Sequence, residues 1–270
     1  MTASIIGAHA APVSSNFGRF AGARQLVRKD TTEWVRSKRI WVILATVTTF
    51  LVLTAANAWI ATKIAAAAAP GEALRELPSL GPTENMVGAL TTQIFVLAAI
   101  FVAGSLIGRE RDSGTLAWIA SKPVTRASIW ASKWISSTAI LSIVGGAIPL
   151  AITAAVVTLL YGAPPVEIVI GLAVGLAAVT AFFVTFGLAL GTVIPGQAAT
   201  IATGLTIFAL APMLAAAIPG GMALIPTAML TWPAAALAGE AMSLATPVVW
   251  FVLMAGLAVF SIRRMRKFEL

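Results

Sequence analysis

A short polar segment interrupts an otherwise apolar sequence and holds the residues best suited to specific contacts. It begins with Glu-Arg-Asp-Ser-Gly-Thr-Leu at residues 110–116, continues with Lys-Pro-Val-Thr-Arg at residues 122–126, and is followed by Lys133. Charged side chains punctuated by Gly and Pro are costly in lipid, so we expect this segment to lie outside the membrane. Its charges, hydroxyls and large apolar side chains suit binding to another protein. A solvated linker, the alternative, would not need the apolar ones.

Local signals in this segment predict two helices. Asp112 or Ser113 can cap a short helix that Pro123 ends, and Thr125 can cap a second helix that starts at Arg126. The side-chain oxygens of Asp, Ser and Thr accept hydrogen bonds from unpaired amides at a helix start, whereas Pro breaks helical hydrogen bonding. The expected result is a short rigid helix, a kink, and a second helix that enters the next apolar stretch.

Catalytic chemistry has few candidates in this sequence. Cysteine is absent and His9 is the only histidine, so thiolate nucleophiles, thiolate metal sites and disulfides are excluded. No Gly-x-x-x-x-Gly-Lys-Ser/Thr phosphate loop occurs, which leaves ATP binding by that motif to another polypeptide. The apolar stretches carry no ionisable pair for a proton relay, which disfavours a proton-driven carrier. We therefore assign no catalytic, cofactor-binding or metal-binding residue.

Composition places the chain in the membrane. Hydrophobic residues make up 59% of it, charged residues only 10%, and the mean hydropathy is +0.94. A spanning helix needs roughly 20 apolar residues, and a spanning strand would be shorter with alternating polar positions. The stretches that meet the helical length are residues 40–62, 86–108, 134–160, 166–194, 197–218 and 244–262. The predicted fold class is an all-α polytopic membrane protein with six transmembrane helices.

Basic residues predict the orientation. Sixteen of the 18 Lys and Arg residues lie before the first stretch, between the second and third, or after the last, which leaves Lys63 and Arg75 for the opposite side. Lys and Arg concentrate on the cytoplasmic side of membrane proteins. We therefore expect both termini in the cytoplasm, with residues 263–270 as a basic cytoplasmic tail and 40–262 as the transmembrane domain.

Residues 218–240 are uncharged until Glu240 and almost long enough to span, but Pro219, Pro226 and Pro233 interrupt them. A seventh crossing would place the basic tail outside. Two interpretations remain: a re-entrant hairpin on the outer side, covered by protein, or an outer loop of two short surface helices.

Glycine pairs spaced four residues apart occur in the predicted spans, at 104/108, 171/175 and 187/191. This spacing lets helices approach closely. The pairs favour either tight packing within the subunit or a seam between two copies.

The N-terminal region is predicted to contain a helix at the membrane surface. Residues 1–16 form a mobile tail, and residues 17–39 form a cytoplasmic amphipathic helix whose apolar face includes Phe20, Val27 and Trp34. Asp30 could restart this helix as a cap. The alternative is a basic juxtamembrane anchor held only by anionic lipid.

Together these residues resemble a known family, the membrane permease subunits of ATP-binding-cassette (ABC) transporters of the type-2 exporter class. Such permeases have six spans with both ends inside, an interfacial N-terminal helix, and Glu-x-x-x-Gly-Thr-Leu, Pro-Val-x-Arg and Lys after the second span. The matching residues here are Glu110, Gly114, Thr115, Leu116, Pro123, Val124, Arg126 and Lys133. The resemblance covers nearly the whole chain.

The resemblance implies that residues 109–133 form a coupling loop that docks into a cytoplasmic ATPase subunit. The residues it assigns to docking are Glu110, Asp112, Ser113, Gly114, Thr115, Leu116, Pro123, Arg126 and Lys133. It also implies two ATPase subunits that bind ATP and Mg²⁺, a second permease copy, identical or related, and a location in the plasma membrane. No nucleic-acid partner is expected.

The expected function is therefore ATP-driven export, and the uncharged spans favour an apolar or amphipathic substrate. Two alternatives belong to other classes. A membrane anchor would recruit a cytoplasmic partner through the same segment without transport, and an ATP-independent carrier would transport without an ATPase. Binding without stimulated ATP hydrolysis would identify the first, and flux without an ATPase the second.

Overall fold

The computed structural model describes residues 22–68, 82–91, 94–115, 124–240 and 242–266, and every regular element in these ranges is helical. The predicted tail at 1–16, Phe20, residues 116–123 and the last four residues of the predicted tail 263–270 lie outside the described part. Residues 263–266 of that tail are the end of the last helix. The first two helices are α1 (Ala23–Arg36) and α2 (Lys38–Ala68). They meet at Ser37, whose extended backbone breaks the helix and whose hydroxyl accepts a hydrogen bond from the Arg39 amide at 3.2 Å.

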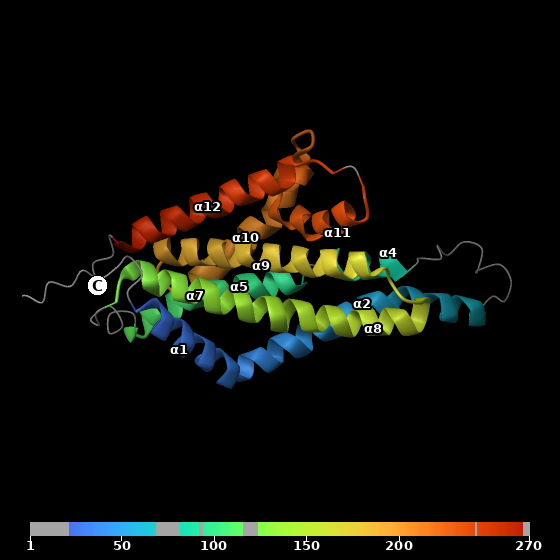
Figure 1. Cartoon of the computed structure of the whole chain (residues 1–270), viewed down its shortest axis with the longest axis horizontal. Helices are drawn as coiled ribbons and strands as arrows, with labels where there is room; N and C mark the ends of the chain where they lie inside the picture. Colours follow the sequence, from blue (N-terminus) through green and yellow to red (C-terminus); the bar gives the residue numbers. More distant parts are fainter. Residues whose placement is uncertain (1–21, 69–81, 92–93, 116–123, 241, 267–270) are drawn as a thin grey trace, which may run out of the picture.

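The remaining helices follow the predicted apolar stretches. They are α4 (Pro82–Thr91), α5 (Ile94–Asp112), α7 (Arg126–Ile140), the π-helical η1 (Leu141–Ala147), α8 (Ile148–Tyr161), α9 (Val166–Val193), α10 (Gln197–Ala216), the 3-10 turns η2 (Gly221–Leu224) and η3 (Pro226–Leu230), α11 (Trp232–Leu237) and α12 (Ala245–Arg266). The elements α7, η1 and α8 run on as one rod of 36 residues. Most helices lie roughly along one long axis (Figure 1).

Five helices of the described chain are long and apolar enough to cross a membrane: α2, the α7–α8 rod, α9, α10 and α12. The stretch expected at residues 86–108 is not among them. It is divided between α4 and α5, and the last turn of α5 carries Arg109, Glu110, Arg111 and Asp112. The polytopic all-α fold is confirmed, while the count of six spans stays a prediction.

Helix α9 forms the centre of the bundle. In its most apolar 18-residue window 61% of the residues are buried, against 17% in α2, α10 and α12. A Cβ added at Gly187 would collide with Ala103 of α5, and one at Gly191 would press on Ile107. At these positions the glycine spacing serves packing within the subunit, because only the absence of side chains lets α5 and α9 approach so closely.

The proline-rich segment packs along α9. Gly171 faces the backbone of Ala234 in α11, and Gly175 faces the carbonyl oxygen of Leu230 in η3. Met229, Leu230 and Ala234 are buried. Gly175 is nine residues inside α9, about 14 Å from its start at the α-helical rise. Figure 1 shows α11 lying beside α9 rather than beyond its end.

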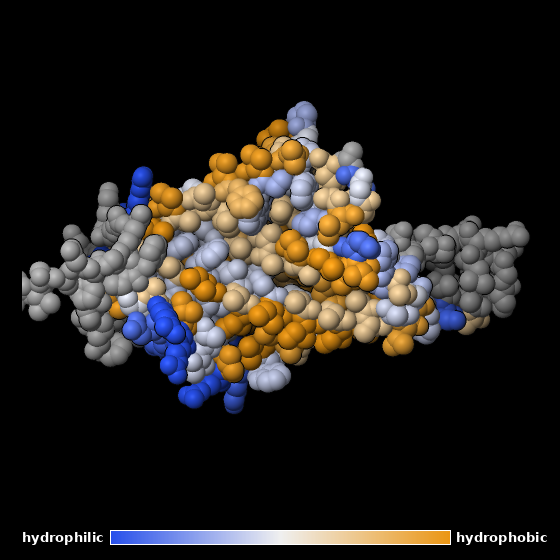
Figure 2. Space-filling model, in the orientation of Figure 1, coloured by the Kyte–Doolittle hydropathy of each residue, from blue (hydrophilic) through white to orange (hydrophobic). Residues whose placement is uncertain are grey.

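Apolar side chains dominate the outer flanks of the bundle. Exposed large side chains on α12 include Val248, Phe251, Val252 and Phe260. Figure 2 shows hydrophobic residues along the flanks and most of the strongly hydrophilic ones at one end. A soluble protein would not expose such an area. The flanks therefore suit contact with lipid.

Candidate functional site

The polar segment starts where α5 ends. Helix α5 stops at Asp112, a turn follows at Ser113 and Gly114, and Gly114 takes a left-handed φ of 71° that suits glycine. Ser113 and Thr115 join their hydroxyls at 2.8 Å, and Ser113 also bonds the Glu110 carbonyl at 3.3 Å. Arg111 to Gly114 are exposed at this end of the molecule. The predicted docking residues Leu116 and Pro123 lie outside the described residues.

An ion pair joins the two ends of the segment 110–133. Lys133 Nζ of α7 lies 2.5 Å from Glu110 Oε1 of α5, and only 6% and 16% of these side chains are exposed. Both residues were expected to contact another subunit. In this conformation Lys133 is buried against its own chain, so the pair acts as a brace between α5 and α7. Docking by these two side chains stays a prediction.

Asp112 bonds to a third helix. Its carboxylate oxygen accepts a hydrogen bond from the backbone amide of Gln197, the first residue of α10, at 3.1 Å. A carboxylate is favourable there because the first amides of a helix are unpaired and carry partial positive charge. Asp112 was expected as a possible cap of the short helix after it; the structure places it in the last turn of α5 with its side chain on α10.

Thr125 caps α7, as predicted. Its hydroxyl oxygen accepts from the Ser128 amide at 3.2 Å, and its extended backbone (φ −81°, ψ 149°) is typical of a cap. The helix therefore begins at Arg126, as the sequence indicated.

Arg126 reaches α12. Its Nη1 donates to the Met265 carbonyl oxygen at 3.0 Å, next to the last residue of that helix. The final carbonyls of a helix have no partner within it, and a cation there is stabilised by the helix dipole. The half-buried Arg126 thus attaches the end of α12 to the start of α7.

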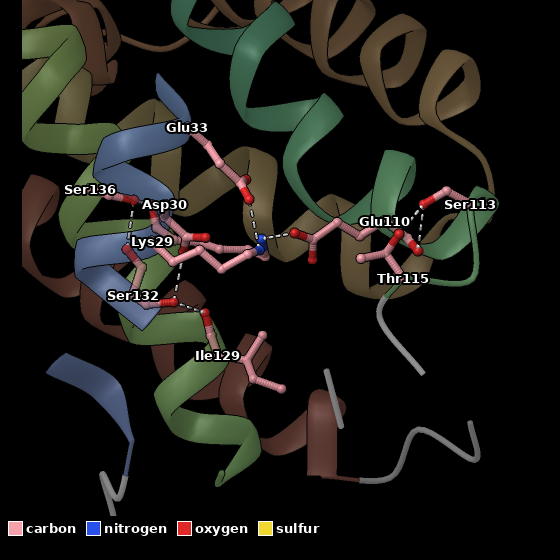
Figure 3. Close-up of polar contacts among 10 residues, drawn as sticks. Lys29, Asp30, Glu33, Glu110, Ser113, Thr115, Ile129, Ser132 and Ser136 are labelled. Atoms are coloured by element: carbon pink, nitrogen blue, oxygen red, sulfur yellow. Dashed lines mark hydrogen bonds and ion pairs between the residues drawn. The ribbon is translucent and has the colours of Figure 1, made fainter. Parts of the chain in front are cut away.

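Helix α1 packs on α7 through an unexpected acid. Asp30 is 8% exposed, and its Oδ2 accepts from Ser132 Oγ at 2.9 Å (Figure 3). The prediction that Asp30 restarts a helix is wrong, because α1 runs unbroken through it. Val27 and Trp34 are half-buried, and Trp34 packs on the cluster around Ile129 and Trp130.

Lys29 lies beside Asp30 and pairs with Glu33 at 3.1 Å. Partial burial alone would lower the pKa of Lys29, but the hydrogen bond and charge of Glu33, with the charges of Asp30 and Glu110, raise it above the ordinary lysine value. The ammonium is therefore fixed in the charged state.

The geometry is that of a braced contact surface. Exposed residues 111–114 follow Glu110 at the end of α5. Glu110 pairs with Lys133 of α7, Asp112 accepts from the start of α10, and Arg126 of α7 donates to the end of α12. In the described ranges no group of three His, Cys, Asp or Glu residues could hold a metal ion. Such a surface can transmit a displacement from a partner to several helices at once.

A scan against protein-family models matches residues 24–264 to the ABC-2 family transporter protein. The chain belongs to the ABC-2 transporter family. It is a multi-pass membrane permease, and membership of this family implies partnership with ATP-binding subunits. A search of curated proteins gave no match for this ABC-2 permease.

Sequence reasoning missed the contacts of Asp30, Gln197 and Met265 in this ABC-2 permease. Asp30 had a detectable signal, because Val27, Asp30 and Trp34 recur at three- and four-residue spacing and therefore share one helix face. Gln197 and Met265 receive their contacts through backbone atoms, for which the sequence carries no signal.

Proposed function

We propose that this chain is the transmembrane permease subunit of an ATP-driven exporter, coupled to a separate ATPase subunit through the segment 110–133. The observation that carries the proposal is a set of three contacts behind the exposed turn. The contacts Glu110–Lys133, Asp112–Gln197 and Arg126–Met265 connect the ends of the segment 110–133 to α5, α7, α10 and α12. Movement imposed on the turn would reach these helices without being absorbed by a flexible linker.

In this proposal two permease copies, identical or related, form the pathway, and two ATPase subunits bind at the cytoplasmic turns. ATP and Mg²⁺ belong to the ATPase subunits. Of the 18 basic residues, 16 lie in segments predicted to share one side of the membrane, which supports cytoplasmic termini. The plasma membrane is the proposed location.

An apolar or amphipathic substrate is supported by the interior. Phe182, Phe183, Phe186 and Phe208 form a ring cluster with centroid separations of 5.3–6.4 Å. The cluster borders an apolar cavity of about 120 Å³ between α9, α10 and η3. Such a wall offers few hydrogen bonds to a sugar or an ion, but it suits a hydrocarbon chain or ring.

The test separates docking from folding. Ser113→Arg places a long charged side chain on the exposed turn and removes only local hydroxyl contacts. Ala163→Arg, in the exposed loop between α8 and α9, is the matched control at the other end of the bundle. The full chain is purified from its native membrane in mild detergent, and co-purifying ATPase and ATP hydrolysis are measured.

We expect Ser113→Arg to lose the ATPase or its stimulation, while Ala163→Arg behaves as wild type and both variants keep the wild-type unfolding midpoint. Unchanged stimulation in Ser113→Arg would contradict docking at this turn. A bound partner without stimulated hydrolysis would favour the non-transporting anchor, and substrate flux with no ATPase present the independent carrier.

A further inference from the structure

A polar cavity of about 480 Å³ opens beside the brace, where the α1–α2 elbow meets α5 and α7. Its wall comes from both sides of Ser37, from the last two turns of α5, from Ser113 and Thr115 just after α5, and from one face of α7. The volume lies within the range of small-ligand sites. None of the contacts described above requires so large a space.

The charges around this cavity do not balance. Four basic residues and three acids line it, which leaves an excess of one positive charge. Glu33 pairs with Lys29, Glu110 pairs with Lys133, and Asp30 accepts a hydrogen bond from the neutral Ser132. Figure 3 shows these contacts converging from α1, α5 and α7. Arg39 and Arg109 also line the cavity, and within the described chain neither guanidinium has a carboxylate partner.

Hydroxyl groups complete the wall. Ser37, Ser105, Ser136 and Ser137 all border the cavity. Ser105 and Ser136 bond to carbonyls of their own helices, whereas the buried Ser137 Oγ has no hydrogen-bond partner among the described residues. Two guanidinium groups and a hydroxyl in the wall of one cavity offer hydrogen-bond donors suited to the oxygens of a phosphate.

The position of the cavity favours a phosphate that is attached to lipid. Arg39 lies in the first turn of α2 and Arg109 in the last turn of α5, so both occupy the boundary between apolar and polar surface. Next to them α1 and the elbow expose Arg24, Arg28, Arg36 and Lys38, visible as the blue area over α1 in Figure 2. Such a basic surface concentrates anionic headgroups.

We propose that the elbow cavity binds a phosphate group between Arg39 and Arg109, carried by the headgroup of an anionic phospholipid. The lipid would hold the α1–α2 elbow against α5 and α7, next to the Glu110–Lys133 brace. Ser113 of the exposed turn also borders the cavity, but the proposed phosphate contacts come from Arg39 and Arg109 and do not depend on an ATPase partner.

The test is thermal unfolding of the full chain, purified in mild detergent, with dihexanoyl phosphatidylglycerol or inorganic phosphate at equal concentrations. The test variant is Arg39→Gln/Arg109→Gln. The control, Arg263→Gln/Arg264→Gln, removes the same charge from exposed positions of α12 outside the cavity wall. A ligand that binds only the folded state raises the midpoint.

We expect the short-chain lipid to raise the midpoint of wild type and control, and its apparent affinity to fall by at least about tenfold in Arg39→Gln/Arg109→Gln, because charge-assisted hydrogen bonds are lost. An equal effect of inorganic phosphate in wild type, lost in the same variant, would show that a free phosphate suffices. No shift in wild type, or an equal shift in both double variants, would overturn the proposal.

Discussion

At the scale of single residues, the Glu110–Lys133 pair is the contact whose loss should cost most. Lys133→Met leaves the Glu110 carboxylate with 16% of its side chain exposed and without its cation. Removing one member of a buried pair leaves an uncompensated charge, so we expect a loss of about 3 kcal/mol in the free energy of unfolding. The measurement is the unfolding midpoint of the purified chain in mild detergent.

Lys29→Met is the matched control, because the Lys29–Glu33 pair is 39% and 61% exposed and should contribute less than about 1 kcal/mol. The double variant Glu110→Gln/Lys133→Met should recover much of the lost stability, since no charge is left unpaired. Equal midpoints for Lys133→Met and Lys29→Met would contradict the brace.

Arg126 gives a second prediction at this scale. Arg126→Glu should repel the carbonyl end of α12, which Nη1 now contacts at Met265. We expect reduced ATPase stimulation together with a lower unfolding midpoint, whereas Arg126→Lys should retain part of both because it keeps the positive charge. A variant that lost stimulation at an unchanged midpoint would mean that Arg126 contacts the partner directly.

At the scale of elements, hydropathy predicted the helices far better than their contacts. The stretch 166–194 agrees with Val166–Val193 almost to the residue, since Pro165 and the extended Ile194 bound it. Helix α1 was predicted with Asp30 as a local cap, but its carboxylate bonds α7 instead. Capping rules consider only neighbouring residues of one helix, so they cannot predict a bond from the Ser132 hydroxyl, which is 102 residues away in the sequence.

The placement of the proline-rich segment gives a prediction for elements. Gly175→Ala would drive a Cβ into the Leu230 carbonyl, which is backbone and cannot rotate away, so η3 and α11 must separate from α9. We expect a destabilisation of about 1–3 kcal/mol. The control Gly256→Ala has open space in α12 and should be neutral or slightly stabilising. Equal unfolding midpoints of the two variants would argue against this packing.

At the scale of the whole molecule, the arrangement in the membrane follows from where the charges lie. The sequence predicted six crossings, and the structure has five helices long and apolar enough to span the membrane. The sixth predicted stretch is divided between α4 and α5, and the charges in the last turn of α5 keep that helix from meeting the same criterion. An even number of crossings keeps both basic ends on one side. The segment 218–240 must then begin and end on the other side, whether it is re-entrant or lies on the surface.

The absence of cysteine allows a direct test of this arrangement, because every introduced thiol is the only one in the chain. Ser113→Cys, Ala163→Cys and Ala238→Cys lie at exposed positions of the α5 end, the α8–α9 loop and the segment after α11. In intact cells a membrane-impermeant maleimide should label Ala163→Cys and Ala238→Cys but reach Ser113→Cys only after lysis. The reason is that the basic residues near Ser113 favour the cytoplasm by the positive-inside bias. Labelling of Ser113→Cys from outside would reverse the orientation and place the docking turn beyond the reach of a cytoplasmic ATPase. Labelling of Ala163→Cys but not Ala238→Cys before lysis would instead make 218–240 a crossing.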